Sequence, residues 1–409
     1  MNLLLQTTHS NLKAQIAVTG SKSETNRLLL LQALFPNITL ANTSNSDDSE
    51  VMQKALKGND EIIDIHHAGT AMRFLTAYLA TQEGREVVLT GSSRMQERPI
   101  KVLVEAIAQL GVKITYEKEV GYPPIRIKGQ KVTASKVTMA ANVSSQYISA
   151  LLLIAPKLEN GLELVLEGEI TSIPYIKMTL ALLNDLDIQT SFEGNIIKVF
   201  PKHEVTTKEM VVESDWSSAS YFFSLVALAN EAAISLTSYK ENSLQGDSEL
   251  VSIYKKLGVE TKFENNKITL TKQSNFQFED VNFELNNTPD IAQTIVVTCL
   301  GVGIGCHLTG LHTLKIKETD RLEALRIELT KLGANITVTN DSLTLVASTN
   351  INHNVKIATY NDHRMAMAFA PLALKVPIII ENADVVSKSY PDFWEDMKSL
   401  GFIISQINA

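Results

Sequence analysis

The hydrophobic pattern of the chain repeats one motif six times. In each copy, a segment with helical periodicity ends at a glycine or its equivalent and runs directly into a short segment of alternating apolar and polar residues. Glycine is favoured where a helix ends because it adopts a left-handed conformation without a Cβ penalty. Alternation predicts a strand with one buried face. The junctions lie at 51–65, 105–116, 181–192, 252–263, 326–338 and 394–404.

The spacing of these junctions predicts a repeated α/β architecture. From Gly111 onward they lie about 70 residues apart, which is enough for a few strands and two helices in each copy. The alternative is that an α/β protein shows several such junctions by chance. A chain of 409 residues is also too long for one ordinary core, so two domains are expected.

Composition and charge narrow the class of protein. The chain is 44% hydrophobic and 20% charged, as in well-packed globular proteins. The longest apolar stretch, 291–310, is interrupted by Gln293, glycines and His307, so no membrane span is expected. The start of the chain lacks a signal-peptide pattern, which predicts a cytoplasmic protein. A net charge of −8 argues against nucleic acid as a partner.

Two cysteines, Cys299 and Cys306, lie seven residues apart in an apolar stretch. Spacing alone leaves a disulfide open, but buried thiols are the preferred interpretation.

The segment from Gly20 to Arg27 predicts an anion site. A Gly-Ser turn leads into a leucine-rich helix, whose first backbone N–H groups lack partners, and Lys22 and Arg27 add positive charge near that end. An ordinary helix cap would explain Ser21 and Ser23 but not the two cations. A P-loop is excluded because Lys22 does not directly follow the glycine.

Weaker signals follow in the first half of the chain. Gly69 allows close approach of the backbone, and Thr70 could cap a helix or donate its hydroxyl. Arg94 belongs to a segment with two arginines before a helix that we expect to start at Pro99. Each of these features is weak by itself.

Two further segments carry polar groups at helix starts. Ser144, Ser145 and Gln146 precede an apolar helix and are more typical of a cap than of a site. Ser172 and Tyr175 supply a hydroxyl and a phenol that could face a polyol ring.

The second half of the chain holds the strongest charged motifs. Lys317 and Arg321 lie four residues apart, which predicts one helical face with Glu318 beside them, and an exposed salt-bridged helix is the alternative. His363 and Arg364 belong to a polar cluster, 360–364, before a helix of small apolar residues. The histidines lack a recognisable metal-ligand spacing, so no metal is expected. Lys388 precedes the last helix.

Together these motifs resemble those of the 5-enolpyruvylshikimate-3-phosphate synthase family, in the same order from Gly20 to Asp392. The resemblance rests on Gly-Ser-Lys-Ser with Asn26-Arg27, on Lys-Glu-Thr-Asp-Arg-Leu at 317–322, and on Asn-Asp-His-Arg-Met-Ala-Met at 361–367. It implies an α/β fold of two domains, each an inside-out barrel of three βαβαββ repeats, with the substrates in the interdomain cleft. One domain would comprise 1–19 and 216–409 and the other 20–215, with a hinge near 20 and 215.

The resemblance also implies the reaction. The enolpyruvyl group of phosphoenolpyruvate would pass to the 5-hydroxyl of shikimate 3-phosphate through a tetrahedral ketal, releasing phosphate. No cofactor and no metal are implied, and a monomer is expected.

The family motifs map onto individual positions of this sequence. The catalytic residues would be Lys22, Asp290 and Glu318, with Glu318 moving the proton at C3 of phosphoenolpyruvate and Asp290 that of the hydroxyl. The substrates would contact Lys22, Ser23, Arg27, Gly69, Thr70, Arg94, Ser144, Ser145, Gln146, Ser172, Tyr175, Asp290, Thr313, Lys317, Arg321, His363, Arg364 and Lys388. Of these, phosphoenolpyruvate would be held by Lys22, Gly69, Arg94, Gln146, Arg321, Arg364 and Lys388.

Three positions depart from the family pattern. His67 and Thr313 stand where the family usually has Asn, and Phe74 stands where it has Pro. His67 and Thr313 keep the capacity to form hydrogen bonds.

Three other functions compete with this interpretation. The related transferase that acts on UDP-N-acetylglucosamine carries a loop cysteine that 91–99 lacks, and RNA 3′-phosphate cyclases fit the negative charge poorly. A non-catalytic paralogue that binds anions is the third.

Overall fold

The chain folds into two compact units. A computed structural model describes residues 1–141, 144–170 and 173–407. The discontinuous unit comprises Met1–Thr19 and Glu213–Ala409, and the inserted unit comprises Gly20–Val212. The second boundary therefore falls at Glu213, three residues before the position expected from the sequence. The hinge near 20 and 215 stays a prediction.

The predicted helix-to-strand junctions are present in the structure. Each joins a helix to a strand as follows: α2 (Asp47–Lys57) to β4 (Ile62–Asp64), α5 (Lys101–Gln109) to β6 (Ile114–Tyr116), α7 (Ile173–Asp185) to β10 (Thr190–Glu193), α9 (Leu250–Lys255) to β14 (Val259–Glu264), α11 (Arg321–Lys331) to β18 (Ile336–Val338), and α13 (Phe393–Ser399) to β22 (Ile403–Ile407). Gly111, Gly258, Gly333 and Gly401 have φ between 76° and 94°, and Asp187 has φ 56°. Gly58 is extended at φ −85°, which makes the first copy the least regular.

The sheets of the inserted unit follow one pairing rule. The first has the order β4-β5-β7-β6, with β5 at Glu86–Thr90 and β7 at Ile125–Lys128. The second has the order β8-β9-β11-β10, with β8 at Lys136–Ala140, β9 at Leu162–Glu167 and β11 at Ile196–Val199. In both, the first two strands are parallel and the other pairings are antiparallel. The third contains only a parallel pair among the described residues, β3 (Ile38–Ala41) with β12 (Lys208–Val211).

The discontinuous unit repeats the same rule in three four-stranded sheets of the described chain. Their orders are β2-β13-β15-β14, β16-β17-β19-β18 and β20-β21-β1-β22. The strands not yet placed are β1 (Asn2–Gln6), β2 (Asn11–Ile16), β13 (Glu231–Thr237), β15 (Lys267–Lys272), β16 (Val281–Glu284), β17 (Cys306–Thr309), β19 (Leu343–Leu345), β20 (Val355–Ile357) and β21 (Ile378–Ile380). Strand β1 pairs with both β21 and β22, so the N-terminal strand completes the last sheet.

Helices fill the interior of the inserted unit. All twelve residues of α3 (Gly69–Ala80) are buried, and α3 packs against α1 (Lys22–Leu34) and α6 (Ser145–Ile154). A helix covered on every side must be apolar nearly throughout, as 74–80 largely are. The short α4 (Ser93–Gln96) and η1 (Ala155–Lys157) complete the helices described here. Helix α5 begins at Lys101 after Ile100, two residues later than the start expected at Pro99.

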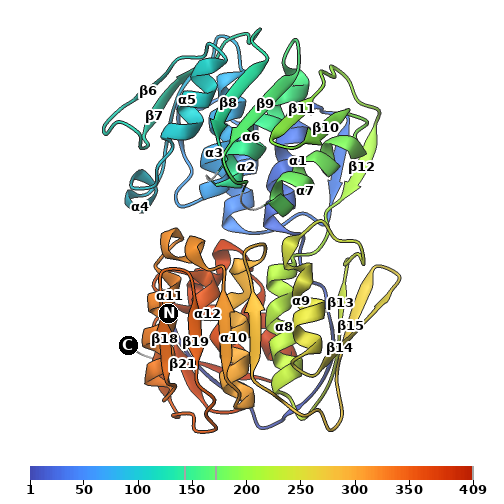
Figure 1. The fold of residues 1–409 in the computed structure, drawn as a ribbon, viewed down its shortest axis with the longest axis vertical. Coiled ribbons are helices and arrows are strands. Elements are labelled where there is room, and N and C mark those ends of the chain that lie inside the picture. The colour runs from blue at the N-terminus through green and yellow to red at the C-terminus, as the bar shows by residue number, and fades with distance from the viewer. Residues whose placement is uncertain (142–143, 171–172, 408–409) are drawn as a thin grey trace. The chain divides into compact units, whose positions relative to one another are not determined.

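The discontinuous unit has the same layering around α8 (Trp216–Leu228) and α10 (Ala292–Val302), which pack against each other (Figure 1). Cys299 on α10 and Cys306 on β17 are free thiols, and both are buried as predicted. The other helical segments are η2 (Gly246–Glu249), η3 (Pro289–Ile291), η4 (His312–Ile316), α12 (His363–Phe369), η5 (Ala370–Leu374) and η6 (Ala383–Lys388).

Each unit therefore has buried helices covered by small mixed sheets, the inside-out arrangement expected from the sequence (Figure 1). Within the described residues, no helix has the length and apolar character needed to cross a membrane.

Candidate active site

The backbone at Gly20 is packed so closely that no side chain would fit there. A Cβ at this position would lie 1.9 Å from the carbonyl oxygen of Asn42 and 2.8 Å from Cγ1 of Val212. The glycine therefore lets the turn pack tightly before α1, whose first residue is Lys22. Ser21 makes no side-chain cap hydrogen bond, so its hydroxyl does not compete for the N–H groups at this helix start.

Lys22 pairs with a carboxylate that the sequence did not single out. Its Nζ lies 3.4 Å from Oδ2 of Asp48, which is 6% exposed in the first turn of α2. Ser23 is half-buried beside it. Asp48 could not be found from spacing, because a carboxylate in a first helical turn is usually explained by the helix dipole alone.

Arg27 is enclosed by the inserted unit and holds three helices together. Its Nε donates to Oγ1 of Thr179 on α7 at 2.8 Å, and its Nη2 donates to Oγ of Ser149 on α6 at 2.9 Å. Its guanidinium lies over the rings of Phe74 and Tyr175, 5.4 Å and 5.8 Å from their centroids. Burial lowers the pKa of Arg27 to about 10.

The Phe74 departure thus has a structural role. Where the family usually has Pro, the aromatic face of Phe74 contributes a cation–π contact to the buried Arg27.

A side-chain hydrogen bond joins the starts of α3 and α6. Nε2 of Gln146 donates to Oγ1 of Thr70 at 3.1 Å. Ser144 caps α6 by accepting from the backbone N–H of Gln146 at 3.4 Å, so the capping interpretation holds for this residue. Ser145 is buried in the first turn. Ser172 lies outside the described residues, whereas Tyr175 lies on α7 against Arg27.

The arginine beside Gly69 is Arg98. A Cβ on Gly69 would lie 2.7 Å from Nη1 of Arg98, so the glycine leaves room for this guanidinium at the start of α3. Arg94 instead lies on α4, more than half exposed, in an ion pair with Glu97 at 2.8 Å. The motif at 94–100 contains two arginines, and the sequence alone did not show which of them lies beside Gly69.

His67 lies near the partner of Lys22. It lines a hollow of about 220 Å³ together with His66 and the carboxylates Asp47, Asp48 and Glu50 at the start of α2. The histidine at this family Asn position therefore adds a titratable group close to Asp48.

The second cluster of site residues lies in the discontinuous unit and is centred on Arg321. This side chain is 1% exposed, and its guanidinium donates to three carboxylates. Nε contacts Oδ2 of Asp362 at 2.6 Å, Nη1 contacts Oδ1 of Asp290 at 2.9 Å, and Nη2 contacts Oε2 of Glu318 at 2.8 Å. Burial opposes a charge here, but these three carboxylates raise the pKa of Arg321 above its ordinary value.

The helical face expected for Lys317 and Arg321 is wrong. Helix α11 begins only at Arg321, because Asp320 caps it by accepting from the backbone N–H of Glu323. Lys317 and Glu318 precede the helix in extended or irregular backbone. Lys317 nevertheless reaches the same carboxylate as Arg321, with its Nζ 3.4 Å from Oδ1 of Asp290.

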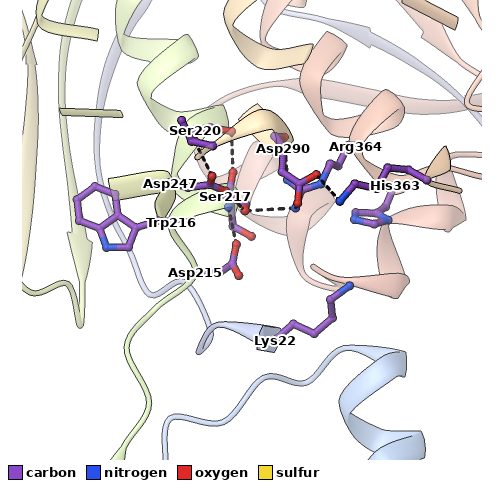
Figure 2. A network of polar contacts seen from close by, with 12 residues as sticks. Lys22, Asp215, Trp216, Ser217, Ser220, Asp247, Asp290, His363 and Arg364 are labelled. Atoms are coloured by element: carbon purple, nitrogen blue, oxygen red, sulfur yellow. Dashed lines mark hydrogen bonds and ion pairs between the residues drawn. The ribbon is translucent and has the colours of Figure 1, made fainter. Parts of the chain in front are cut away.

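Asp290 is surrounded by cations, as Figure 2 shows in part. Nη2 of Arg364 lies 3.4 Å from its Oδ2, opposite the Oδ1 that faces Lys317 and Arg321. Burial alone would raise the pKa of Asp290, but the charges of Lys317, Arg364 and Arg321 hold it well below its ordinary value. The group is a carboxylate in the free protein.

The remaining predicted residues of this unit lie close to the cluster in sequence. His363 is buried at the start of α12, where Asp362 caps the helix by accepting from the backbone N–H of Arg364. Nζ of Lys388 donates to the carbonyl oxygen of Asn361 at 2.6 Å. The hydroxyl of Thr313 is buried and has no hydrogen-bond partner within the described residues.

Among the described residues, no three His, Cys, Asp or Glu side chains are grouped so that they could hold a metal ion. The functional chemistry on view is that of cations, carboxylates and hydroxyls.

Repeated mixed sheets around buried helices, together with two cation-rich clusters, define an inside-out α/β barrel protein that can bind small anions. Comparison with known proteins agrees. The family model described as EPSP synthase (3-phosphoshikimate 1-carboxyvinyltransferase) matches residues 53–397. The chain belongs to the EPSP synthase family.

Individual relatives support this assignment over nearly the whole chain. The 3-phosphoshikimate 1-carboxyvinyltransferase of Bacteroides fragilis (strain YCH46) is 45% identical over 397 residues, covering 96% of each chain. The enzyme of the same name from Colwellia psychrerythraea is 34% identical over 417 residues, covering 94% of this chain and 96% of its own. The solved structure of EPSP synthase from Acinetobacter baumannii shares the fold, with a TM-score of 0.81 at 20% identity over 99% of this chain and 100% of its own.

The contacts of Arg321 predict a large stability effect of Asp362. Replacing Asp362 with Ala leaves a buried guanidinium without its closest carboxylate and removes the cap of α12. We expect the free energy of unfolding of the discontinuous unit to fall by about 3–5 kcal/mol. Urea titration followed by tryptophan fluorescence measures this, because Trp216 and Trp394 both belong to that unit.

The control is Glu323→Ala, which removes a carboxylate from the much more exposed pair with Arg326. An exposed pair is worth about 0.2–1 kcal/mol. A cost for Asp362→Ala as small as that of the control would contradict the central role of this ion pair.

Proposed function

We propose that this chain transfers the enolpyruvyl group of phosphoenolpyruvate to the 5-hydroxyl of shikimate 3-phosphate and releases phosphate. Membership of the EPSP synthase family supports the reaction, as do the full-length relatives named for it. The observation that carries the proposal for this chain is the Asp290 cluster, in which a candidate base and three candidate anion-binding cations are already assembled.

Charge balance supports the choice of substrates. Phosphoenolpyruvate and shikimate 3-phosphate each carry one carboxylate and one phosphate, and with about −1.5 to −2 for each phosphate they bring roughly five to six negative charges together. Helix termini contribute only about 0.3–1 kcal/mol each to anion binding, so side-chain cations must supply most of the attraction. The residues that we assign to this role are Lys22, Arg27, Arg94, Lys317, Arg321, Arg364 and Lys388. We add Arg98 because its guanidinium lies beside Gly69.

Among these cations, Arg27 has the most indirect role. Its donors are directed to Ser23, Ser149, Thr179 and Tyr175 of the protein itself. We infer that it acts on shikimate 3-phosphate mainly by fixing Ser23 and the ring of Tyr175.

Proton transfer is the chemistry that the carboxylates would perform. Glu318 is paired with Arg321 in the free protein, so it must gain a proton when the substrates bind. It then gives this proton to C3 of phosphoenolpyruvate, and the 5-hydroxyl attacks C2 as Asp290 accepts the hydroxyl proton. The resulting ketal then loses phosphate while Glu318 takes a proton back from C3. Asp290 gives the hydroxyl proton that it accepted to the departing phosphate, so both carboxyl groups end in the protonation state in which they began. Such a pair of proton-transfer groups in different surroundings is what addition and elimination require.

The surroundings of Asp290 link its basicity to substrate binding. Lys317, Arg364 and Arg321 hold its pKa low in the free protein. Anionic substrates that draw these cations toward themselves would weaken their effect on Asp290 and raise its pKa. The carboxylate would then become a stronger base only when the acceptor is present.

Several contacts remain part of the proposal. We assign Lys22 to assist Asp290, and Thr70, Ser144, Ser145, Gln146, Ser172, Thr313, His363 and Lys388 to orient the substrates. The hydroxyl of Thr313 is buried and finds no partner in the part of the chain that the structure describes, which supports a ligand contact there, because leaving such a group without a hydrogen bond is costly. That the enzyme works as a monomer in the cytoplasm stays a prediction.

Phosphate release tests the function directly. With purified protein and phosphoenolpyruvate, without added metal, we expect release that requires shikimate 3-phosphate. A parallel reaction with UDP-N-acetylglucosamine is the control and should stay silent. Silence with both acceptors, alongside intact binding of shikimate 3-phosphate, would favour the non-catalytic paralogue instead.

Glu318→Gln tests proton transfer at C3. The amide keeps the size of the side chain but cannot deliver a proton, so we expect kcat to fall by about a hundredfold or more. The dissociation constant of shikimate 3-phosphate, measured by calorimetry, should change little. Near-normal turnover would remove Glu318 from the mechanism.

Asp290→Asn tests the base for the hydroxyl. We expect kcat to fall by about a hundredfold or more, because an amide cannot accept the proton. Steady-state kinetics with both substrates distinguishes this role from a purely orienting one. An increase in KM with unchanged kcat would show that Asp290 only positions the acceptor.

A further inference from the structure

Asp247 forms a polar anchor behind the candidate active site. It lies in the η2 turn, is 6% exposed, and belongs to none of the groups assigned to the reaction above. Both of its carboxylate oxygens accept a hydroxyl hydrogen bond. Thr288 donates to Oδ1 at 2.7 Å, and Ser217 donates to Oδ2 over a short distance.

The Ser217 hydroxyl connects Asp247 to Arg364, as the dashed lines in Figure 2 show. A hydroxyl has one proton, and a carboxylate can only accept, so Ser217 gives its proton to Asp247. Its lone pairs are then available to Arg364, whose Nη2 donates to Oγ of Ser217 at 3.2 Å. These donor and acceptor roles fix the direction of the two hydrogen bonds: the guanidinium donates to the hydroxyl, and the hydroxyl donates to the carboxylate.

The Thr288 hydroxyl connects Asp247 to the other side of the same site. Thr288 is 3% exposed and directly precedes the short η3 helix that carries Asp290. Holding its side chain fixes the entry to that helix. Arg364 also binds this short helix, because its Nη1 donates to the carbonyl oxygen of Asp290 at 3.1 Å.

Asp247 is poorly placed to serve as a proton-transfer group itself. Both oxygens accept from hydroxyls, that of the buried Thr288 and that of the half-buried Ser217, and its nearest links to the substrate-binding groups run through these two residues. Burial and the charge of Asp290 raise its pKa, whereas Arg364 and the two hydroxyls oppose that change. The contacts of Asp247 therefore indicate a role other than direct contact with the reacting atoms.

We propose that Asp247 is a positioning residue that, through Ser217 and Thr288, fixes Arg364 and Asp290 relative to each other before the substrates bind. This inference rests on the proposed function, in which Arg364 holds phosphoenolpyruvate and Asp290 accepts the hydroxyl proton. Asp247 acts through two arms, its hydrogen bond with Ser217 and its hydrogen bond with Thr288. The Ser217 arm serves binding of phosphoenolpyruvate, and the Thr288 arm serves the chemical step.

The test removes each arm separately and measures kcat and both KM values. In Ser217→Ala, Arg364 loses its link to the anchor, and we expect the KM for phosphoenolpyruvate to rise about tenfold, the effect of one charge-assisted hydrogen bond. The KM for shikimate 3-phosphate should stay within about twofold. Ser217→Thr keeps the hydroxyl and should restore the KM for phosphoenolpyruvate.

The second arm has the opposite signature. Thr288→Val keeps the shape of the side chain but removes the hydroxyl, so Asp290 is held less firmly. We expect kcat to fall about tenfold while the KM for phosphoenolpyruvate changes little. Asp247→Ala should combine both effects. In the double variant Ser217→Ala/Asp247→Ala, the increase in KM should match that of Asp247→Ala alone, because the two residues act through one chain of hydrogen bonds.

Ser224→Ala is the matched control. Ser224 is also a serine of α8, is fully buried, and accepts a hydrogen bond from Thr298 at 2.7 Å rather than contacting Asp247 or Arg364. It should lower thermal stability without separating kcat from KM.

The outcomes distinguish the inference from the function on which it rests. Wild-type protein without turnover would overturn both. An active wild type with a KM for phosphoenolpyruvate unchanged in Ser217→Ala would overturn the positioning role alone. A parallel increase of both KM values that follows loss of thermal stability, as a purely structural role predicts, would overturn it too.

Discussion

A buried guanidinium organises the discontinuous unit. Arg321 is almost completely removed from water, and a charge in that position is tolerated only if carboxylates surround it. Asp362, Asp290 and Glu318 meet this requirement, and they come from three separate segments of the chain. The start of α11, the η3 turn and the start of α12 are therefore held at one point. The candidate proton-transfer groups are positioned by the same contacts that neutralise Arg321.

This arrangement means that the free protein supplies its own anions. Lys22 pairs with Asp48, and Lys317, Arg321 and Arg364 surround Asp290, so an overall negative chain keeps its cations locally balanced. Under the proposed function, an incoming phosphate or carboxylate would share these cations with protein carboxylates. This sharing would moderate the attraction for substrate and make the ionisation of Asp290 depend on whether substrate is bound.

The sequence predicted local features better than partners. The helix-to-strand junctions followed from hydrophobic periodicity and from glycines such as Gly333, because these depend on neighbours in the chain. The inside-out layering was expected only from the family resemblance. Asp48, Arg98, Asp247 and Asp362 were not assigned roles, since each acquires its partner from a distant segment. The helical face expected for Lys317 and Arg321 failed because Asp320 caps the helix between them, a local competition that four-residue spacing does not reveal. Whether the predicted substrate contacts form stays a prediction.

Strand β1 gives the fold a consequence for the order of events during synthesis. It pairs on one side with β21 and on the other with β22, so the last sheet of the discontinuous unit needs residues from both ends of the chain. The inserted unit is encoded between these ends and has a hydrophobic core of its own. On the ribosome the inserted unit can become compact while β1 is still unpaired. The edges of β1 stay exposed until about four hundred residues have been made. A chain released early would carry a finished inserted unit and an open sheet edge, the state in which aggregation competes most strongly with folding.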